Sequence, residues 1–122
     1  MLLMSWFRKS STKTAFDWQE LTSEEQFLNL LEQQNQFAVF KHSTRCSISS
    51  MAKNRLENNW DIDDSTPIYY LDLIRYRNIS NLIADKLNVE HQSPQLILIR
   101  NGEAIYNASH NGIDVEALKK VI

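Results

Sequence analysis

The chain has 122 residues, a formal net charge of −2 at pH 7, and 43% hydrophobic and 23% charged residues. A chain of this length is expected to form one domain whose core needs no metal or disulfide. The absence of a Lys/Arg-rich block gives nucleic-acid binding no support, and a single cysteine excludes a disulfide within the chain and favours a reducing compartment.

Residues 1–15 are expected to form a flexible segment that precedes a folded domain over residues 16–122. The apolar stretch at residues 1–7 is ended by Arg8 and Lys9. It is shorter than a signal-peptide core of ~7–15 apolar residues and far shorter than a membrane span of ~20. We therefore expect a cytoplasmic protein without a membrane span.

The first half of the domain alternates strand and helix signals. Residues 16–21 alternate apolar and polar side chains, which suits a short strand. Ser23 precedes two glutamates, a signature of a helix start, and the apolar face that follows predicts a helix to about Gln34. The run at residues 37–41 predicts a buried strand.

A second helix is expected from near Cys46 to about Asn59. Its apolar residues have the i, i+3, i+4 spacing of a face that packs on a sheet. The residues expected on this face are Ile48, Met51, Ala52, Arg55 and Leu56.

The second half of the domain predicts a strand, a helix, a hairpin and a last helix. The strand at residues 67–74 is almost continuously apolar, which is typical of a parallel sheet covered on both sides. The further predicted elements are a helix over 78–88, a strand over 95–100, an Asn101-Gly102 hairpin turn, a strand over 103–108 and a helix capped by Asp114 that runs to Val121. The order predicts an α/β fold with three layers and a mixed sheet of four to five strands.

Cys46 stands where a predicted strand ends and a predicted helix begins. The unpaired N–H groups and the dipole of a helix N-terminus favour thiolate over thiol, and the neighbouring Arg45 adds positive charge. Ser43, Thr44 and Ser47 suit an exposed turn. Two interpretations follow: a reactive thiol, or a small packing residue of the kind that most lone cysteines are.

The pattern around Cys46 resembles the thioredoxin fold. In that fold the reactive cysteine follows a strand, and a cis proline that precedes a later strand faces it. Ser93-Pro94 stands at the corresponding place, and the Asn101-Gly102 hairpin and the closing helix follow in order. The resemblance implies a cis Ser93–Pro94 bond and a thioredoxin-like α/β/α sandwich.

A closer resemblance is to the monothiol bacilliredoxins, redox proteins of the bacillithiol system that are related to glutaredoxins. It covers residues 18–122. The motifs that carry it are Lys41-His42-Ser43, Cys46-Ser47-Ile48-Ser49, His91-Gln92-Ser93-Pro94-Gln95, Asn101-Gly102-Glu103 and Asn107-Ala108-Ser109-His110. The chain departs from the family at Ser47, where proline is usual, and serine adds a hydroxyl and an N–H beside the sulfur.

The resemblance implies a thiol–disulfide oxidoreductase. Cys46 would take a low-molecular-weight thiol, bacillithiol or glutathione, from S-thiolated cytosolic proteins. Ser49 occupies the position of a resolving cysteine, so a second thiol molecule or a separate disulfide reductase must release the thiol. The thiol is a co-substrate, and no tightly bound cofactor is expected.

The resemblance also implies which residues surround the thiol. Thr44, Arg45, Ser47 and Ser49 would line one side of the site, Ser93 and Pro94 the other, and the turn Asn111, Gly112 and Asp114 would contact the charged end of the small thiol. A competing interpretation of Asp114 is that it caps the last helix. His42 is an auxiliary candidate that could polarise the site.

Two other functions remain compatible with the sequence. One is a module that binds an iron–sulfur cluster or a thiol, as monothiol glutaredoxins with Cys-Gly-Phe-Ser do, although Ser47-Ile48 replaces Gly-Phe here. The other is a thioredoxin-fold protein whose thiol is idle. No metal site is expected, because the three histidines and the cysteine lack the compact spacing of zinc ligands.

Overall fold

The computed structural model describes residue 16 and residues 18–122, so the flexible segment expected at residues 1–15 lies outside the described residues. The elements follow the predicted order. They are β1 (Gln19–Glu20), α2 (Glu24–Gln33), β2 (Gln36–His42), α3 (Ser47–Asn59), β3 (Ile68–Asp72), α4 (Arg77–Leu87), β4 (Gln95–Arg100), β5 (Glu103–Ser109), the 3-10 turn η2 (His110–Gly112) and α5 (Val115–Lys119).

The strands form one mixed sheet in the order β1-β3-β2-β4-β5. β3 lies parallel to both β1 and β2, while β4 runs antiparallel to β2 and to β5. The predicted mixed sheet with a final antiparallel hairpin is therefore confirmed. β2 and β4 lie at the centre of the sheet, and this position explains why their sequences are apolar on both faces.

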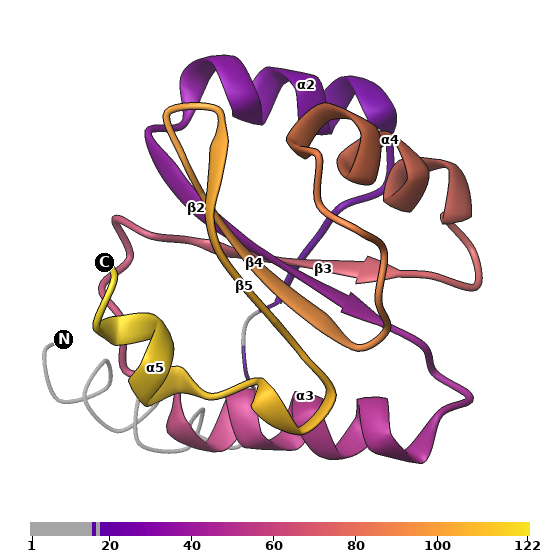
Figure 1. Cartoon of the computed structure of the whole chain (residues 1–122), viewed down its shortest axis with the longest axis vertical. Helices are drawn as coiled ribbons and strands as arrows, with labels where there is room; N and C mark the ends of the chain where they lie inside the picture. The colour runs from indigo at the N-terminus through magenta and orange to yellow at the C-terminus, as the bar shows by residue number, and fades with distance from the viewer. Residues whose placement is uncertain (1–15, 17) are drawn as a thin grey trace, which may run out of the picture.

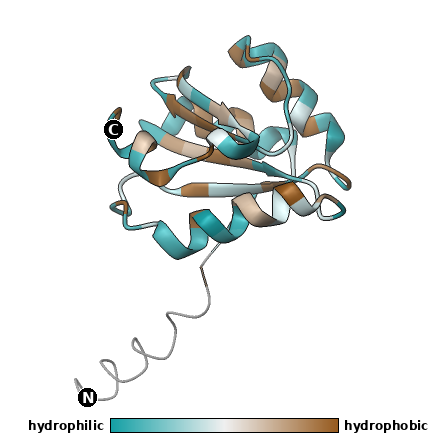
Figure 2. Ribbon diagram, turned by 60° about the horizontal axis from the view of Figure 1, so that its bottom comes forward, coloured by the Kyte–Doolittle hydropathy of each residue, from teal (hydrophilic) through white to brown (hydrophobic). Residues whose placement is uncertain are grey.

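Helices cover both faces of the sheet, with α2 and α4 on one side and α3 and α5 on the other (Figure 1). Alternate residues of β2 supply the two cores, because successive side chains of a strand point to opposite faces. Phe37 and Val39 pack with residues of α2 and α4, whereas Ala38 and Phe40 pack with residues of α3 and α5. Figure 2 shows the helices alternating between hydrophilic and hydrophobic residues, as expected of elements that cover a sheet.

The capping and turn residues predicted from the sequence form the expected local structures. Ser23 caps α2 by accepting a hydrogen bond from the Gln26 N–H, and Asp114 caps α5 by accepting one from the Ala117 N–H. Asn101 and Gly102 both have positive φ, 52° and 79°, as a tight hairpin turn between twisted strands requires.

The predicted packing face of α3 is partly wrong. Ala52 and Leu56 are buried, but Ile48 is 45% and Met51 58% exposed. Ser49 is buried in their place, because the helix is rotated so that the Ser49 hydroxyl bonds to groups at the end of β2. Two apolar side chains therefore lie on the surface in the first turns after Cys46.

The last helix is also shorter than predicted. It ends at Lys119, and Val121 lies beyond it. The Val121 carbonyl accepts a hydrogen bond of 2.6 Å from Arg100 Nη2. The Lys120 and Val121 N–H groups bond to the carbonyls of Ala117 and Leu118 in a final turn, and the Arg100 bond ties this turn to β4.

Candidate functional site at the carboxyl end of β2

The loops that carry the predicted site residues meet at one edge of the sheet. β2 and β3 are parallel and end together, with His42 opposite Asp72. β4 runs the other way, so that its first residue, Gln95, pairs with Lys41 near the same edge. β5 ends beside Gln95 at Ser109. The segment of Cys46, the Ser93–Pro94 loop and η2 therefore converge.

Cys46 is the N-cap residue of α3 and has extended backbone geometry, φ −111° and ψ 121°. Its N–H donates to the Ser43 carbonyl at 3.1 Å, and its carbonyl accepts from the Ser50 N–H at 3.0 Å. The residue is partly exposed, and the first turn of α3 contains no acidic side chain. The predicted place of the thiol between a strand and a helix is thus the observed one, at the positive end of a 13-residue helix.

Exposed polar residues surround the cysteine along the chain. Thr44, Arg45 and Ser47 are all exposed. Ser93 is half-buried and Pro94 buried, and their peptide bond is cis, as the thioredoxin resemblance implied. The Ser93 hydroxyl is shielded from solvent and has no hydrogen-bond partner in the described part of the chain.

Ser49, unlike Thr44, Arg45 and Ser47, is fully buried. Its Oγ accepts a hydrogen bond from the Ser43 N–H at 3.0 Å and lies 2.6 Å from His42 Nδ1. The hydroxyl is therefore engaged inside the protein, whereas its contact with a small thiol stays a prediction.

His42 is 4% exposed and lies beneath the loop that bears Cys46. Its ring stacks on Phe40 and packs against Tyr70, at centroid distances of 5.7 and 5.5 Å. Burial lowers the pKa of His42, and the Lys53 cation lowers that pKa further, against weaker opposing effects of Asp72, Ser49 and Glu57. Lowering of the pKa favours the neutral imidazole.

The turn before α5 is anchored to the proline loop and to α3. The His110 N–H donates to the Pro94 carbonyl at 3.1 Å. Arg55 donates to the carbonyls of His110 and Ile113, at 3.0 and 3.3 Å. Sequence reasoning placed Arg55 on the face packed against the sheet and missed this role, since its acceptors lie more than fifty residues away along the chain.

Asn111 and Gly112 are exposed on that turn, as a ligand-contact role requires. Asp114 is also exposed, but its carboxylate accepts the Ala117 N–H at 3.2 Å. The structure thus supports the capping role for Asp114. A contact of these three residues with a small thiol stays a prediction.

The site edge also contains a buried basic group, Lys41, whose contact with His91 was not predicted from the sequence. Lys41 is fully buried on the face of β2 opposite His42, and its Nζ lies 3.4 Å from His91 Nδ1. Ser80 Oγ lies 2.9 Å from the same nitrogen. Burial, together with the Arg77 cation, lowers the pKa of Lys41 to about 8 and also lowers that of His91. The signal was present, because Lys41 extends the alternation of Phe37 and Val39 into the core.

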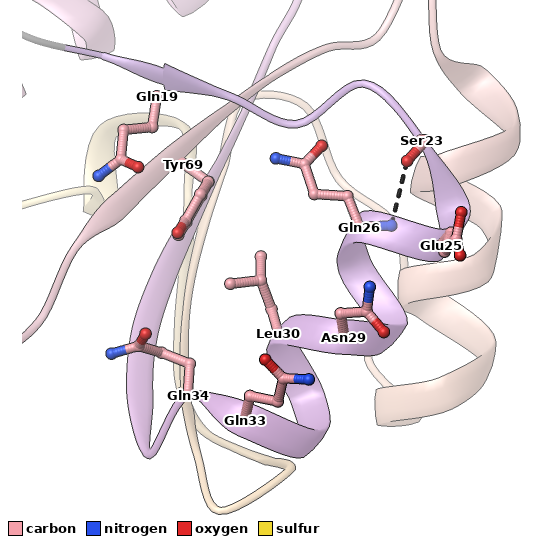
Figure 3. Close-up of a pocket in the computed structure, with 9 residues that line it drawn as sticks. All are labelled: Gln19, Ser23, Glu25, Gln26, Asn29, Leu30, Gln33, Gln34 and Tyr69. Carbon is pink, nitrogen blue, oxygen red and sulfur yellow. Dashed lines mark hydrogen bonds between the residues drawn. The ribbon is translucent and has the colours of Figure 1, made fainter.

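One pocket of the protein lies on the face of the sheet away from Cys46. A pocket of about 440 Å³ lies between α2 and the β1–β3 edge and is lined mainly by amide side chains, among them Gln26, Asn29 and Gln33 (Figure 3). α2 covers the face of the sheet opposite α3 (Figure 1), so that this pocket includes none of the predicted site residues. Within residues 16 and 18–122 no group of three or more His, Cys, Asp or Glu side chains is placed to hold a metal ion.

The architecture defines a thioredoxin-fold protein with one cysteine at the N-terminus of the helix after the central strand. A solved structure described as a proposed oxidoreductase with a thioredoxin fold is 34% identical, with a TM-score of 0.75, over 84% of this chain and 90% of that one. Mitochondrial thioredoxin 3 from Saccharomyces cerevisiae is 20% identical, with a TM-score of 0.67, over 91% and 96%. Thioredoxin from Malassezia sympodialis is 20% identical, with a TM-score of 0.65, over 86% and 87%.

Residues 19–118 match the family described as monothiol bacilliredoxin BrxC. The match covers most of the chain, and the chain belongs to this family. It is therefore a redox thiol protein, and its one cysteine is Cys46. None of the helices in the described residues has the length and hydrophobicity needed to cross a membrane.

Proposed function

We propose that the protein is a monothiol thiol–disulfide oxidoreductase that removes a low-molecular-weight thiol, with a preference for bacillithiol, from protein mixed disulfides. The observation that carries the proposal is the position of Cys46, partly exposed at the N-terminus of α3 beside the exposed Arg45. A sulfur at such a position is suited to nucleophilic attack. The family match supports the thiol named.

The reaction consists of two exchanges. The Cys46 thiolate attacks the sulfur of the small thiol in the mixed disulfide, so that the target protein leaves as a thiolate and Cys46 holds the small thiol. A second small-thiol thiolate then attacks this adduct, which frees Cys46 and releases the symmetric small-molecule disulfide. Since the chain has one cysteine, it cannot release the adduct by an internal disulfide. A separate cytosolic reductase would recycle the small disulfide, and no tightly bound cofactor is required.

The surface beside the cysteine suits a polypeptide substrate. Ile48 and Met51 are exposed on α3, and Ile74 is 46% exposed in the loop after β3, at the same edge of the sheet. Apolar side chains that gather near a reactive group provide contact area for a partner chain. The backbone before Pro94 would pair with an extended target segment as an added strand does.

The test uses the full chain and a model protein that carries bacillithiol on a single cysteine. We expect intact mass to show the bacillithiol adduct on the enzyme, with release of the free target thiol, and no adduct on a Cys46→Ser variant. Glutathionylated target, run in parallel, should react more slowly. Failure of both targets to transfer their thiol would refute the exchange function, and equal rates would refute the preference for bacillithiol.

A further inference from the structure

We propose that Ser49 is a positioning residue for Cys46 and that a neutral His42 with its proton on Nε2 orients the Ser49 hydroxyl. The inference rests on the proposed function, because it concerns the same thiol. Ser49 occupies the position of a resolving cysteine. The proposal assigns this serine a role of its own, besides the absence of a second thiol.

The hydrogen bonds of Ser49 determine which group donates and which accepts. Ser49 Oγ lies 3.0 Å from the Ser43 nitrogen and 2.6 Å from His42 Nδ1, and the side chain is fully buried. A hydroxyl has one hydrogen to donate and two lone pairs to accept. The Ser43 N–H can only donate, so Ser49 Oγ accepts that bond. The hydroxyl hydrogen is then available for His42.

The ring of His42 is the acceptor that completes this arrangement. Within the described residues Ser49 Oγ makes no other hydrogen bond. If Nδ1 bore a proton and donated it, the buried hydroxyl hydrogen would have no acceptor, which is unfavourable. Nδ1 therefore accepts, and the ring proton belongs on Nε2. The charged groups that act on the His42 ring are Lys53 and Glu57 from α3 and Asp72 from β3. Burial has the largest effect, and it lowers the pKa of the ring.

Ser43 links this pair to the thiol. Its N–H is bound to Ser49, and its carbonyl accepts the Cys46 N–H at 3.1 Å. The turn from Ser43 to Cys46 is thus closed by its own hydrogen bond and is held to the first turns of α3 by the Ser49 hydroxyl. Removal of that hydroxyl frees the first residue of the turn, so that the sulfur loses a defined position at the helix N-terminus.

The experiment compares four variants of the full chain. Ser49→Ala removes the hydroxyl, and Ser50→Ala is the matched control, because Ser50 is the exposed neighbour on the same helix. His42→Asn keeps an acceptor oxygen near the place of Nδ1, whereas His42→Phe keeps the ring stacking and removes the acceptor. The readouts are the rate of Cys46 alkylation by iodoacetamide over a range of pH and the nitrogen-15 NMR signals of the His42 ring. Circular dichroism verifies the fold of each variant.

We expect Ser49→Ala and His42→Phe to slow alkylation at neutral pH by about three- to tenfold, the scale of one hydrogen bond, and to move the pH profile upward. Ser50→Ala should match the wild type, and His42→Asn, which keeps an acceptor, should be slowed less than His42→Phe. Wild-type His42 should show a protonated Nε2 and an unprotonated Nδ1. A protonated Nδ1, or equal rates for Ser49→Ala and Ser50→Ala, would overturn the proposal. If Ser49→Ala does not fold, the His42 pair and the wild-type ring signals still decide it. None of these readouts uses a low-molecular-weight thiol, so they are independent of the exchange assay.

Discussion

Lys41 Nζ lies 3.4 Å from His91 Nδ1, in a fully buried position on β2. In the described part of the chain this ammonium forms no ion pair with a carboxylate. A buried cation without an opposite charge destabilises the folded state, and burial accordingly lowers the pKa of Lys41 from 10.5 to about 8.

The first prediction is that Lys41→Met stabilises the protein at neutral pH. The folded state binds the Lys41 proton less tightly than the unfolded state does. The cost of the charge is therefore fully present below the folded pKa and disappears as pH rises through the window between the two values. At pH 7 we expect the variant to unfold with a free energy about 1–3 kcal/mol higher.

Urea denaturation of both proteins at neutral and alkaline pH provides the measurement. The difference in free energy of unfolding should shrink between about pH 8 and pH 10, because the wild-type lysine becomes neutral in the folded state. The comparison cancels the titration of tyrosines, which both proteins share. A difference that stays constant over this window would contradict the assignment.

The second prediction concerns two serine hydroxyls, those of Ser93 in the proline loop and Ser80 in α4. The Ser93 hydroxyl is buried without a partner, whereas the buried Ser80 hydroxyl lies 2.9 Å from His91 Nδ1. Ser93→Ala should raise the free energy of unfolding by about 1 kcal/mol, and Ser80→Ala should lower it by a similar amount. Chemical denaturation measures both free energies of unfolding. Changes of the same sign would contradict the assignment of the Ser93 hydroxyl as unpaired and the Ser80 hydroxyl as hydrogen-bonded.

The third prediction is that Arg55 holds the turn before α5. Arg55→Met removes donors to the carbonyls of His110 and Ile113, and we expect a loss of about 1–3 kcal/mol of stability. Amide hydrogen exchange at Ile113 should accelerate, since its N–H bonds to the His110 carbonyl within that turn. Arg75→Met, at an exposed position, is the control. Unchanged exchange at Ile113 in the Arg55 variant would rule out the anchor.

The fourth prediction is a loss of stability in mild acid that depends on His42. Its pKa is lowered below 6.5 by burial, so the unfolded state binds the proton first as pH falls. The stability contributed by the neutral ring is present above pH 6.5. It is lost as the pH falls through the lowered pKa of His42 in the folded state. Thermal unfolding followed from neutral to mildly acidic pH should show a shallower decline for His42→Phe than for the wild type. A decline of identical slope would exclude His42 as a contributor.

Much of the fold could be predicted because its signals are local. The hydroxyl of Ser23, the Asn101-Gly102 pair and the Asp114 cap act within a few residues of their own position. The burial of Ser49 in place of Met51 could not be predicted, because both positions fit a helical face and the apolar one is ordinarily buried. The alternation along β2 placed Lys41 on the side of Phe37 and Val39, but it gave no indication that the lysine would lie against His91.

The sequence by itself determined the order of strands and helices and the place of its one thiol at the start of α3, because hydrophobic period, capping and turn chemistry depend on near neighbours along the chain. Tertiary structure alone decided the rotation of α3 that buries Ser49 against His42, and the contacts of Lys41 with His91 and of Arg55 with His110. Those contacts join distant parts of the chain. They follow from strand order and from how each helix packs on the sheet, which no local pattern of residues specifies.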